Sequence, residues 1–251
     1  MYTPGLVSVT FRKFSVDEIL ALMKRTELQA IEWGGDVHVP DVQTAMEVKK
    51  KMEASGLVVS SYGSYYRCGE GQDFASVLKC AAALGAPTIR VWAGDQGSLE
   101  ADAAYREKVA SDTRMITAMA MSEGVSISYE FHGGTLTDTT KSAQTLLQEA
   151  ATEGLYTYWQ PPVGSRVEGN METIDLLLPL ISNVHCFEWK ALNGEIVRRP
   201  FAEGVEHWSA YIQKLHDAGK SGHALLEFVK DDNPEQLIED AAALCRILGG
   251  K

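Results

Sequence analysis

This sequence lacks the features that mark several protein classes. It contains no run of about 18 apolar residues, so we expect no membrane-spanning segment. Its first residues, MYTPGLVSVTF, include no basic segment followed by a long apolar run, so we expect no secretory signal peptide. Its Lys and Arg residues are scattered and its net charge is −11, whereas contacts to a nucleic-acid backbone need clustered basic residues. Neither a membrane nor a nucleic acid is therefore an expected partner.

Cysteine is scarce, and its spacing suggests no disulfide framework. The four cysteines stand at positions 68, 80, 186 and 245 and form no CxxC pair. We interpret them as reduced thiols, which predicts a cytoplasmic protein because disulfides persist mainly in oxidising compartments. The chain also shows no linker, no low-complexity tract and no sign of a second domain.

The sequence does contain a regular alternation of short apolar runs and longer amphipathic ones. The expected strands are residues 6–10, 30–33, 57–62, 88–92, 126–130, 156–160, 184–188 and 224–228. The expected helices are residues 15–25, 42–55, 73–84, 99–123, 139–150, 170–180, 205–218 and 234–248. Eight such units in 251 residues predict a single (β/α)8 TIM barrel domain over residues 1–251. A doubly wound open sheet is the alternative, but no G-x-G-x-x-G follows the first strand. Residues 189–204 are the only long segment expected to be irregular.

Chemistry in such barrels lies at the C-terminal ends of the strands. The polar residues expected there are Glu32, Tyr62, Tyr65, Arg90, Trp92, Glu130, His132, Gln160, His185, Glu188 and Glu227. The last four strands thus offer Glu130, Gln160, His185 and Glu227 at matching depth. Oxygen ligands with one imidazole suit a divalent ion, so we predict one bound metal, Mn²⁺ first, with Mg²⁺, Co²⁺ or Zn²⁺ as alternatives.

Each of these residues also has an ordinary structural reading. A single carboxylate at a strand end is most often solvated or caps a helix, and His185 alone would more often be a hydrogen-bonded core histidine. The metal site is favoured because four such coincidences would have to fall on four successive strands.

With these residues in place, the chain resembles the xylose isomerase-like TIM barrel superfamily, the sugar phosphate isomerase and epimerase group. The resemblance runs from AIEWGG near residue 30 to LLEF near residue 227. Members hold one divalent metal with Glu, Asp, His and Glu from the last four strands. Carried over, these fall on Glu130 in SYEFHG, Gln160 in YWQPP, His185 in VHCFEWK and Glu227 in LLEF. The segment VRRPFAEG resembles the ketose 3-epimerase pattern and implies that Arg198 binds substrate.

Two positions depart from the family pattern. The usual aspartate is Gln160 here, which removes one negative charge and should weaken metal binding, because charge attraction dominates such sites. The histidine that the epimerases place three residues later is Val163 here, so their ketohexose substrate range does not carry over.

The resemblance implies a metal-dependent isomerase or epimerase that removes a proton beside the carbonyl of a keto-sugar or related polyol. Glu130 and Glu227 are the predicted catalytic carboxylates. The predicted substrate-binding residues are Arg198, His132, Glu32, Trp92 and Tyr65.

Three other functions stay open on the sequence alone. The same site could run a β-elimination, as the dehydratases and keto-glycoside lyases of this superfamily do, and the missing epimerase histidine slightly favours that reading. A non-catalytic sugar-binding or partner subunit is the second. An endonuclease IV-like repair enzyme is the third, and the acidic charge argues against it. A small-molecule carbohydrate is the expected partner, and a homodimer is expected from the family.

Overall fold

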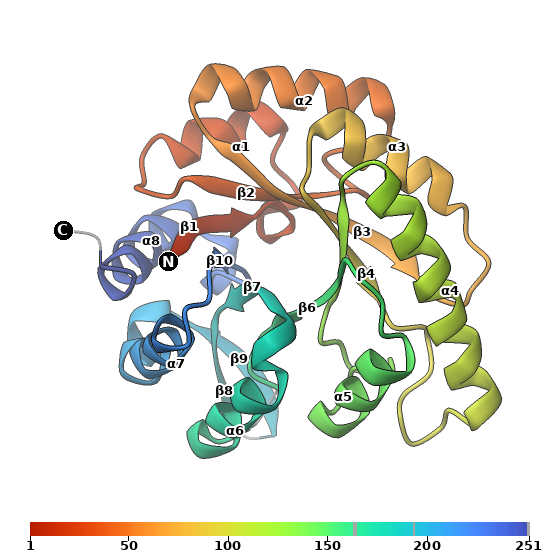
Figure 1. Cartoon of the computed structure of the whole chain (residues 1–251). Coiled ribbons are helices and arrows are strands. Elements are labelled where there is room, and N and C mark those ends of the chain that lie inside the picture. The colour runs from red at the N-terminus through yellow and green to blue at the C-terminus, as the bar shows by residue number, and fades with distance from the viewer. Residues whose placement is uncertain (163–164, 193, 250–251) are drawn as a thin grey trace.

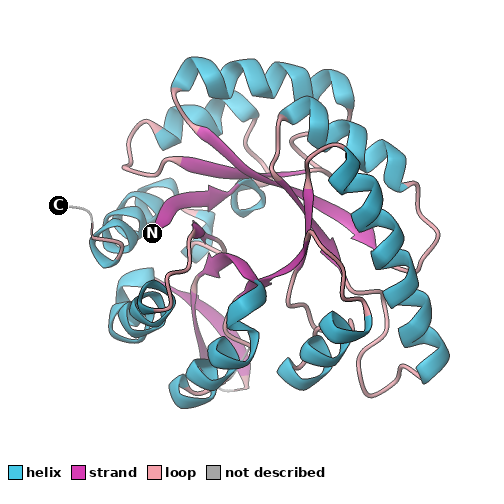
Figure 2. Ribbon diagram, in the orientation of Figure 1, coloured by secondary structure: helices cyan, strands magenta, loops and turns pink. Residues whose placement is uncertain are grey.

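The chain folds into a closed barrel of eight parallel strands surrounded by helices, as the computed structural model shows (Figure 1; Figure 2). Around the barrel the strands follow the order β1-β10-β7-β6-β5-β4-β3-β2. The structure describes residues 1–162, 165–192 and 194–249. The predicted TIM barrel is therefore confirmed, and the open sheet is excluded because β1 pairs with both β10 and β2.

The barrel strands are β1 (Tyr2–Val7), β2 (Ala30–Gly34), β3 (Val58–Arg67), β4 (Thr88–Trp92), β5 (Ser126–Tyr129), β6 (Leu155–Trp159), β7 (Ile181–Cys186) and β10 (Gly222–Leu226). The helices are α1 (Val16–Met23), α2 (Val42–Ser55), α3 (Phe74–Leu84), α4 (Ala103–Ser122), α5 (Thr140–Glu149), α6 (Val167–Leu177), α7 (Val205–Asp217) and α8 (Pro234–Ile247). Short 3₁₀ turns are η1 (Ser8–Phe11), η2 (Leu178–Leu180), η3 (Phe201–Gly204) and η4 (Lys230–Asp232).

Local sequence signals set many helix ends. Ser15 and Glu18 form a reciprocal capping box at the start of α1. Aspartate side chains at positions 41, 73 and 102 accept a backbone N–H at the starts of α2, α3 and α4. Gly56 and Gly85 end α2 and α3 in the left-handed conformation that glycine adopts without strain.

The first predicted strand, residues 6–10, was wrong because it begins about four residues too late. The strand β1 spans Tyr2–Val7, and the apolar residues after it form η1 instead. Pro4 and Gly5 are poor strand formers, so the sequence places the strand too late. Gly5 fits in β1 because of a tertiary contact: a Cβ there would lie 2.5 Å from the carbonyl oxygen of Ala30 on β2.

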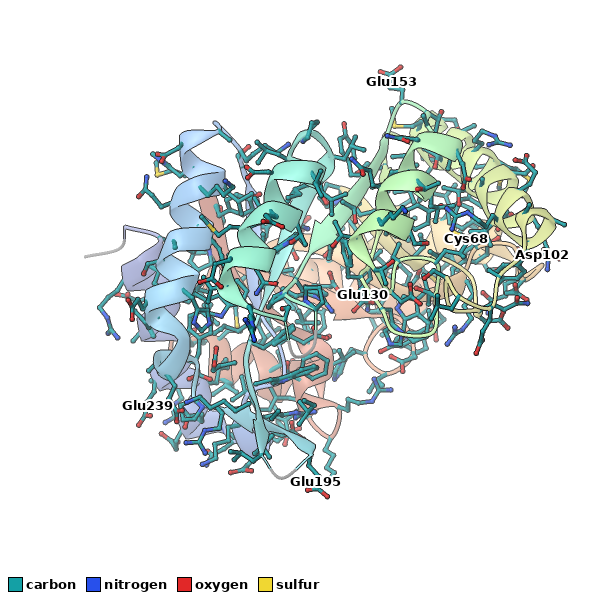
Figure 3. The ribbon with its side chains drawn as sticks, turned by 90° about the horizontal axis from the view of Figure 1, so that it is seen from below. Cys68, Asp102, Glu130, Glu153, Glu195 and Glu239 are labelled. Atoms are coloured by element: carbon teal, nitrogen blue, oxygen red, sulfur yellow. The ribbon has the colours of Figure 1, made fainter. Side chains whose placement is uncertain are left out.

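The segment expected to be irregular forms a second small sheet, so that prediction was also wrong. Strands β8 (Glu188–Leu192) and β9 (Glu195–Arg199) pair as an antiparallel hairpin directly after β7. The sequence did carry a signal, because Asn-Gly at 193–194 between two extended runs is typical of a two-residue hairpin turn. Figure 3 shows Glu195 at the end of the projecting hairpin and Glu153, before β6, at the opposite end of the molecule. The hairpin therefore rises from the C-terminal ends of the barrel strands.

The interior of the barrel and the helix–sheet layer form one continuous apolar core. Its largest fully buried side chains include Trp33, Trp159 and Trp208. Within the described ranges, no helix has both the length and the apolar character that crossing a bilayer requires.

Candidate metal centre

A buried ion-paired group fills one side of the barrel mouth. Arg90 on β4 donates from Nε to Glu32 Oε1 on β2 at 2.7 Å and from Nη1 to Glu130 Oε2, directly after β5. Ser61 Oγ donates to the other oxygen of Glu32 at 2.8 Å. The Glu32 side chain is fully buried and that of Arg90 is 3% exposed. Burial alone would raise the pKa of Glu32, but the charges of Arg90 and His185 outweigh it and hold this pKa well below its usual range.

On the other side, His185 on β7 gathers the predicted metal ligands. Its Nδ1 atom lies 3.0 Å from Gln160 Oε1, 3.1 Å from Glu227 Oε2 and 3.8 Å from Glu130 Oε1. Glu130, His185 and Glu227 each offer one ligand atom within 4.8 Å of the others, and all three residues are buried. Gln160 donates from Nε2 to the Phe131 carbonyl at 2.9 Å, which leaves its oxygen facing the group. The structure thus brings together the four residues that the sequence placed at one depth.

The residues present suit a divalent cation. Glu227 Oε2 is buried, and apart from its contact with His185 Nδ1 it has no hydrogen-bond partner among the described residues, which is costly unless a ligand completes it. Glu32, Glu130 and Glu227 with Arg90 leave two formal negative charges when His185 is neutral. Burial alone would lower the pKa of His185, but Glu227 and Glu32 outweigh it and raise this pKa to about 10. The site therefore attracts positive charge, which a metal ion would supply in place of that proton.

The far nitrogen of His185 faces the buried ion-paired group. Its Nε2 lies 3.6 Å from Glu32 Oε2. A carboxylate behind the second nitrogen of a metal-ligating histidine fixes the orientation of the ring. Glu32 was predicted to bind substrate, and that stays a prediction; in this structure its carboxylate lies behind the histidine, closed off from solvent.

A cavity of about 370 Å³ lies against two of the gathered residues, Glu130 and Gln160. Its lining includes Glu130, His132, Gln160, Phe187, Trp189 and Phe228. The three aromatic rings form one cluster, with Phe187 stacked on Trp189 at 4.4 Å and Trp189 tilted against Phe228 at 4.9 Å. This volume lies within the range of small-molecule sites, and aromatic walls with few polar groups are typical of them. We refer to it below as the metal pocket.

Trp92, His132 and Tyr65 form a second aromatic group beside Glu130. Trp92 donates from Nε1 to Glu130 Oε2 at 2.6 Å, and the His132 ring stacks on the indole at 4.2 Å. Tyr65 meets the indole edge-on at 5.4 Å and lines a neighbouring cavity instead of the metal pocket. Their predicted substrate contacts stay predictions; in this structure Trp92 positions a carboxylate and His132 lines the metal pocket.

Arg198 lies on the hairpin and not among the lining residues of the metal pocket. Its Nη1 donates to Asp232 Oδ1 at 2.6 Å, and its guanidinium lies 5.1 Å from the Phe228 ring centre. Phe228, Asp231 and Asp232 all have positive φ, so Arg198 braces a strained loop directly after Glu227. Its predicted substrate contact stays a prediction.

Sequence reasoning assigned no role to Arg90 and overlooked the pairing of Glu188 with His207. An arginine inside the apolar run TIRVW was the available signal for Arg90, because a fully buried arginine needs paired carboxylates. Val163, where the epimerases have a histidine, lies outside the described residues.

Comparisons with known proteins agree with this fold. The model of the xylose isomerase-like TIM barrel family matches residues 20–248. The chain resembles the structure of the probable 3-DHS dehydratase AsbF from Bacillus anthracis, with 20% identity, a TM-score of 0.77 and 98% of each chain covered. It also resembles a xylose isomerase-like TIM barrel protein from Mycobacterium smegmatis in complex with magnesium, with 14% identity, a TM-score of 0.75, and 99% and 97% covered.

A structure of L-ribulose 3-epimerase is similar too, with 14% identity, a TM-score of 0.74, and 99% and 94% of the two chains covered. At these identities the similarity establishes the fold alone. A search of curated protein sequences found no match.

Proposed function

Since the chain belongs to the xylose isomerase-like TIM barrel family, we propose that it is a metal-dependent isomerase or epimerase of keto-sugars or related polyols. The observation that carries the proposal is the convergence of Glu130, His185 and Glu227, with a buried Glu227 oxygen that, apart from its contact with His185 Nδ1, has no hydrogen-bond partner among the described residues. The similarity to an epimerase structure supports the same reading.

A divalent ion held by Glu130, His185 and Glu227, with Gln160 as a fourth oxygen donor, would polarise the substrate carbonyl and so acidify the neighbouring C–H group. We assign Mn²⁺, because the donors are oxygens and one imidazole. Glu227 is the proposed base: its Oε2 contacts His185 Nδ1 at 3.1 Å, makes no further hydrogen bond with the described residues, and can take the proton from the carbon beside the carbonyl. Glu130 lies on the neighbouring side of His185 and is the proposed second carboxylate, which returns a proton to the carbon skeleton. The aromatic walls of the metal pocket exclude water and pack against the C–H faces of a sugar.

Elimination is the second candidate, and the position of His132 favours it. Its ring lines the metal pocket two residues after Glu130, where it could protonate a departing hydroxyl. The similarity to a probable dehydratase points the same way. Product mass separates the two reactions, because elimination loses water or an alcohol and epimerisation conserves mass.

The test starts from metal content. The protein and its Glu227→Gln variant are loaded with Mn²⁺, desalted and analysed for bound metal, with Glu239→Gln on the exposed face of α8 as a matched control. We expect near one ion per chain in the wild type and in the control, and loss of the ion in Glu227→Gln. Keto-sugars incubated in D₂O with the loaded wild type should take up deuterium beside the carbonyl. If neither metal retention nor deuterium uptake is found, the proposal is wrong and a purely binding role replaces it.

The remaining expectations about partners belong to this proposal. We propose a small carbohydrate as substrate, a cytoplasmic location and a homodimer. A gel-shift assay with duplex DNA should show no complex, because the net charge is −11.

A further inference from the structure

A second cavity lies beside the metal pocket, against the inner face of the β8–β9 hairpin. Its volume is about 130 Å³, and it shares Pro161, Pro162, Phe187 and Trp189 with the lining of the metal pocket. Alternate hairpin residues face it, because Ala191 and Ile196, which are paired in the hairpin, both line it. The two cavities are therefore neighbours with common walls.

Two residues that line this second cavity each carry a buried polar atom with no hydrogen-bond partner among the described residues. Asn170 on α6 is 4% exposed, and its Oδ1 atom makes no hydrogen bond with the described part of the chain, while its Nδ2 donates to Tyr211 at 2.8 Å. The Trp189 Nε1–H group is likewise buried without an acceptor there. A buried acceptor and a buried donor left open cost free energy, which an occupant with both functions would recover.

A carboxylate–imidazole pair completes the polar part of this cavity. Glu188 Oε2 lies 2.9 Å from His207 Nε2, and both residues line the cavity. Gly204 leaves room for this pair, because a Cβ at that position would lie 2.2 Å from Glu188 Oε2 and 2.9 Å from His207 Nε2 and would displace them. This arrangement is built by residues from β8, the end of η3 and α7, and the metal chemistry proposed above does not use it.

These groups select for a particular kind of occupant. A hydroxyl group can accept from an indole N–H and donate to an amide oxygen, so hydroxylated molecules match both open atoms. The carboxylate of Glu188 disfavours an anion, and the apolar faces of Pro161, Pro162 and Tyr211 favour C–H groups beside the hydroxyls. We propose that this second cavity binds a neutral, hydroxyl-bearing group, supplied either by the distal part of a substrate whose reactive end lies in the metal pocket or by a separate polyol. The proposal does not depend on which reaction the metal pocket performs.

The indole N–H resonance of Trp189 gives a direct test. It is assigned in ¹⁵N-labelled protein by its absence in Trp189→Phe and is followed in Mg²⁺-loaded and metal-free protein. The probes are xylitol and sorbitol as free polyols and lactulose as a two-ring ketose. We expect a saturable shift with at least one probe. In Ala191→Phe, which fills the cavity from the hairpin, saturation should need about tenfold more probe, or about 1.4 kcal/mol. Leu192→Phe, on the adjacent exposed position outside the lining, should bind like the wild type.

The outcomes also identify the source of the hydroxyl group. A lactulose shift that requires Mg²⁺ assigns the cavity to the distal part of a substrate. A polyol shift that is equal with and without Mg²⁺ assigns it to a separate molecule. The inference is overturned if no probe shifts the Trp189 resonance up to its solubility limit, since the cavity then holds water only. It is also overturned if Ala191→Phe leaves the shift unchanged, since the probe then binds outside this cavity. Because no turnover is measured, this result is independent of the fate of the isomerase proposal.

Discussion

The two sides of the barrel mouth are built from similar residues, but their carboxylates have different hydrogen-bond and ion-pair partners. On the side of β2, β4 and β5, the carboxylates of Glu32 and Glu130 are held by Arg90, Ser61 and Trp92. On the side of β6, β7 and β10, Gln160, His185 and Glu227 surround one another with no arginine between them. Glu227 Oε2 contacts only His185 Nδ1, at 3.1 Å, and His185 Nε2 makes no hydrogen bond to the described residues.

This difference separates two roles for buried charge. Glu130 is fixed in place because Arg90 and Trp92 both donate to its Oε2, which leaves its Oε1 for a metal ion or a proton. A carboxylate with an open oxygen can accept a ligand or a proton, and Glu227 is therefore suited to chemistry. The following variants test the contrast, from the largest expected effect to the smallest.

Removing Arg90, the cation that pairs with Glu32 and Glu130, should have the largest effect on stability. In Arg90→Gln, Glu32 and Glu130 lose their buried partner, and we expect the free energy of unfolding to fall by about 3–5 kcal/mol. Urea denaturation measures it. Arg25→Gln is the control, because Arg25 pairs with Glu235 at the surface and such pairs contribute about 0–1 kcal/mol. Equal losses in the two variants would show that the buried group is not held as described.

A buried carboxylate without a cation should show the opposite pH response to Glu32. Burial raises the pKa of Asp240 to about 6, although Phe201 N and Gln236 Nε2 donate to it. The folded protein then binds this proton more tightly than the unfolded chain, so the contribution of Asp240 to stability is greatest below about pH 4 and is lost as the pH rises to about 6. We expect a loss of about 3 kcal/mol, absent in Asp240→Asn, from urea denaturation across this range. A flat wild-type profile would contradict the shift.

The bond from Trp92 to Glu130 should be stronger than a neutral one. A double-mutant cycle of Trp92→Phe and Glu130→Ala should give a coupling energy of about 2 kcal/mol, because the acceptor is charged. The same cycle for Trp159→Phe and Thr173→Ala, where the indole donates to a hydroxyl at 2.9 Å, should give about 1 kcal/mol. Similar values in both cycles would remove the argument that Trp92 anchors Glu130.

Adding a negative charge at Gln160, on the side of β6, β7 and β10, should strengthen metal binding. In Gln160→Asp the site gains one negative charge, and we expect Mn²⁺ to bind about tenfold more tightly, or about 1.4 kcal/mol. Metal titration by calorimetry measures it, with Gln43→Asp on the exposed side of α2 as the control. Unchanged affinity in Gln160→Asp would place this side chain outside the metal's ligand set.

Much of the fold could be read from the sequence because it follows local rules. The eight strand–helix repeats, the capping box at Ser15 and the glycine ends at Gly56 and Gly85 depend on residues close in the chain. The errors came where a contact between paired strands decides, as at Gly5 against Ala30, or where a recognisable turn signal at 193–194 was passed over.

For the site, the sequence by itself determined which residues reach the mouth of the barrel. Regular alternation with parallel strands places Glu130, Gln160, His185 and Glu227 at one level wherever the barrel closes. Only the tertiary structure decided which of them are already paired. Arg90 lies 58 residues from Glu32 and 40 from Glu130, and no local pattern specifies that it lies between them. Pairing of buried charges depends on distances across the barrel, and those exist only once all eight strands are in register.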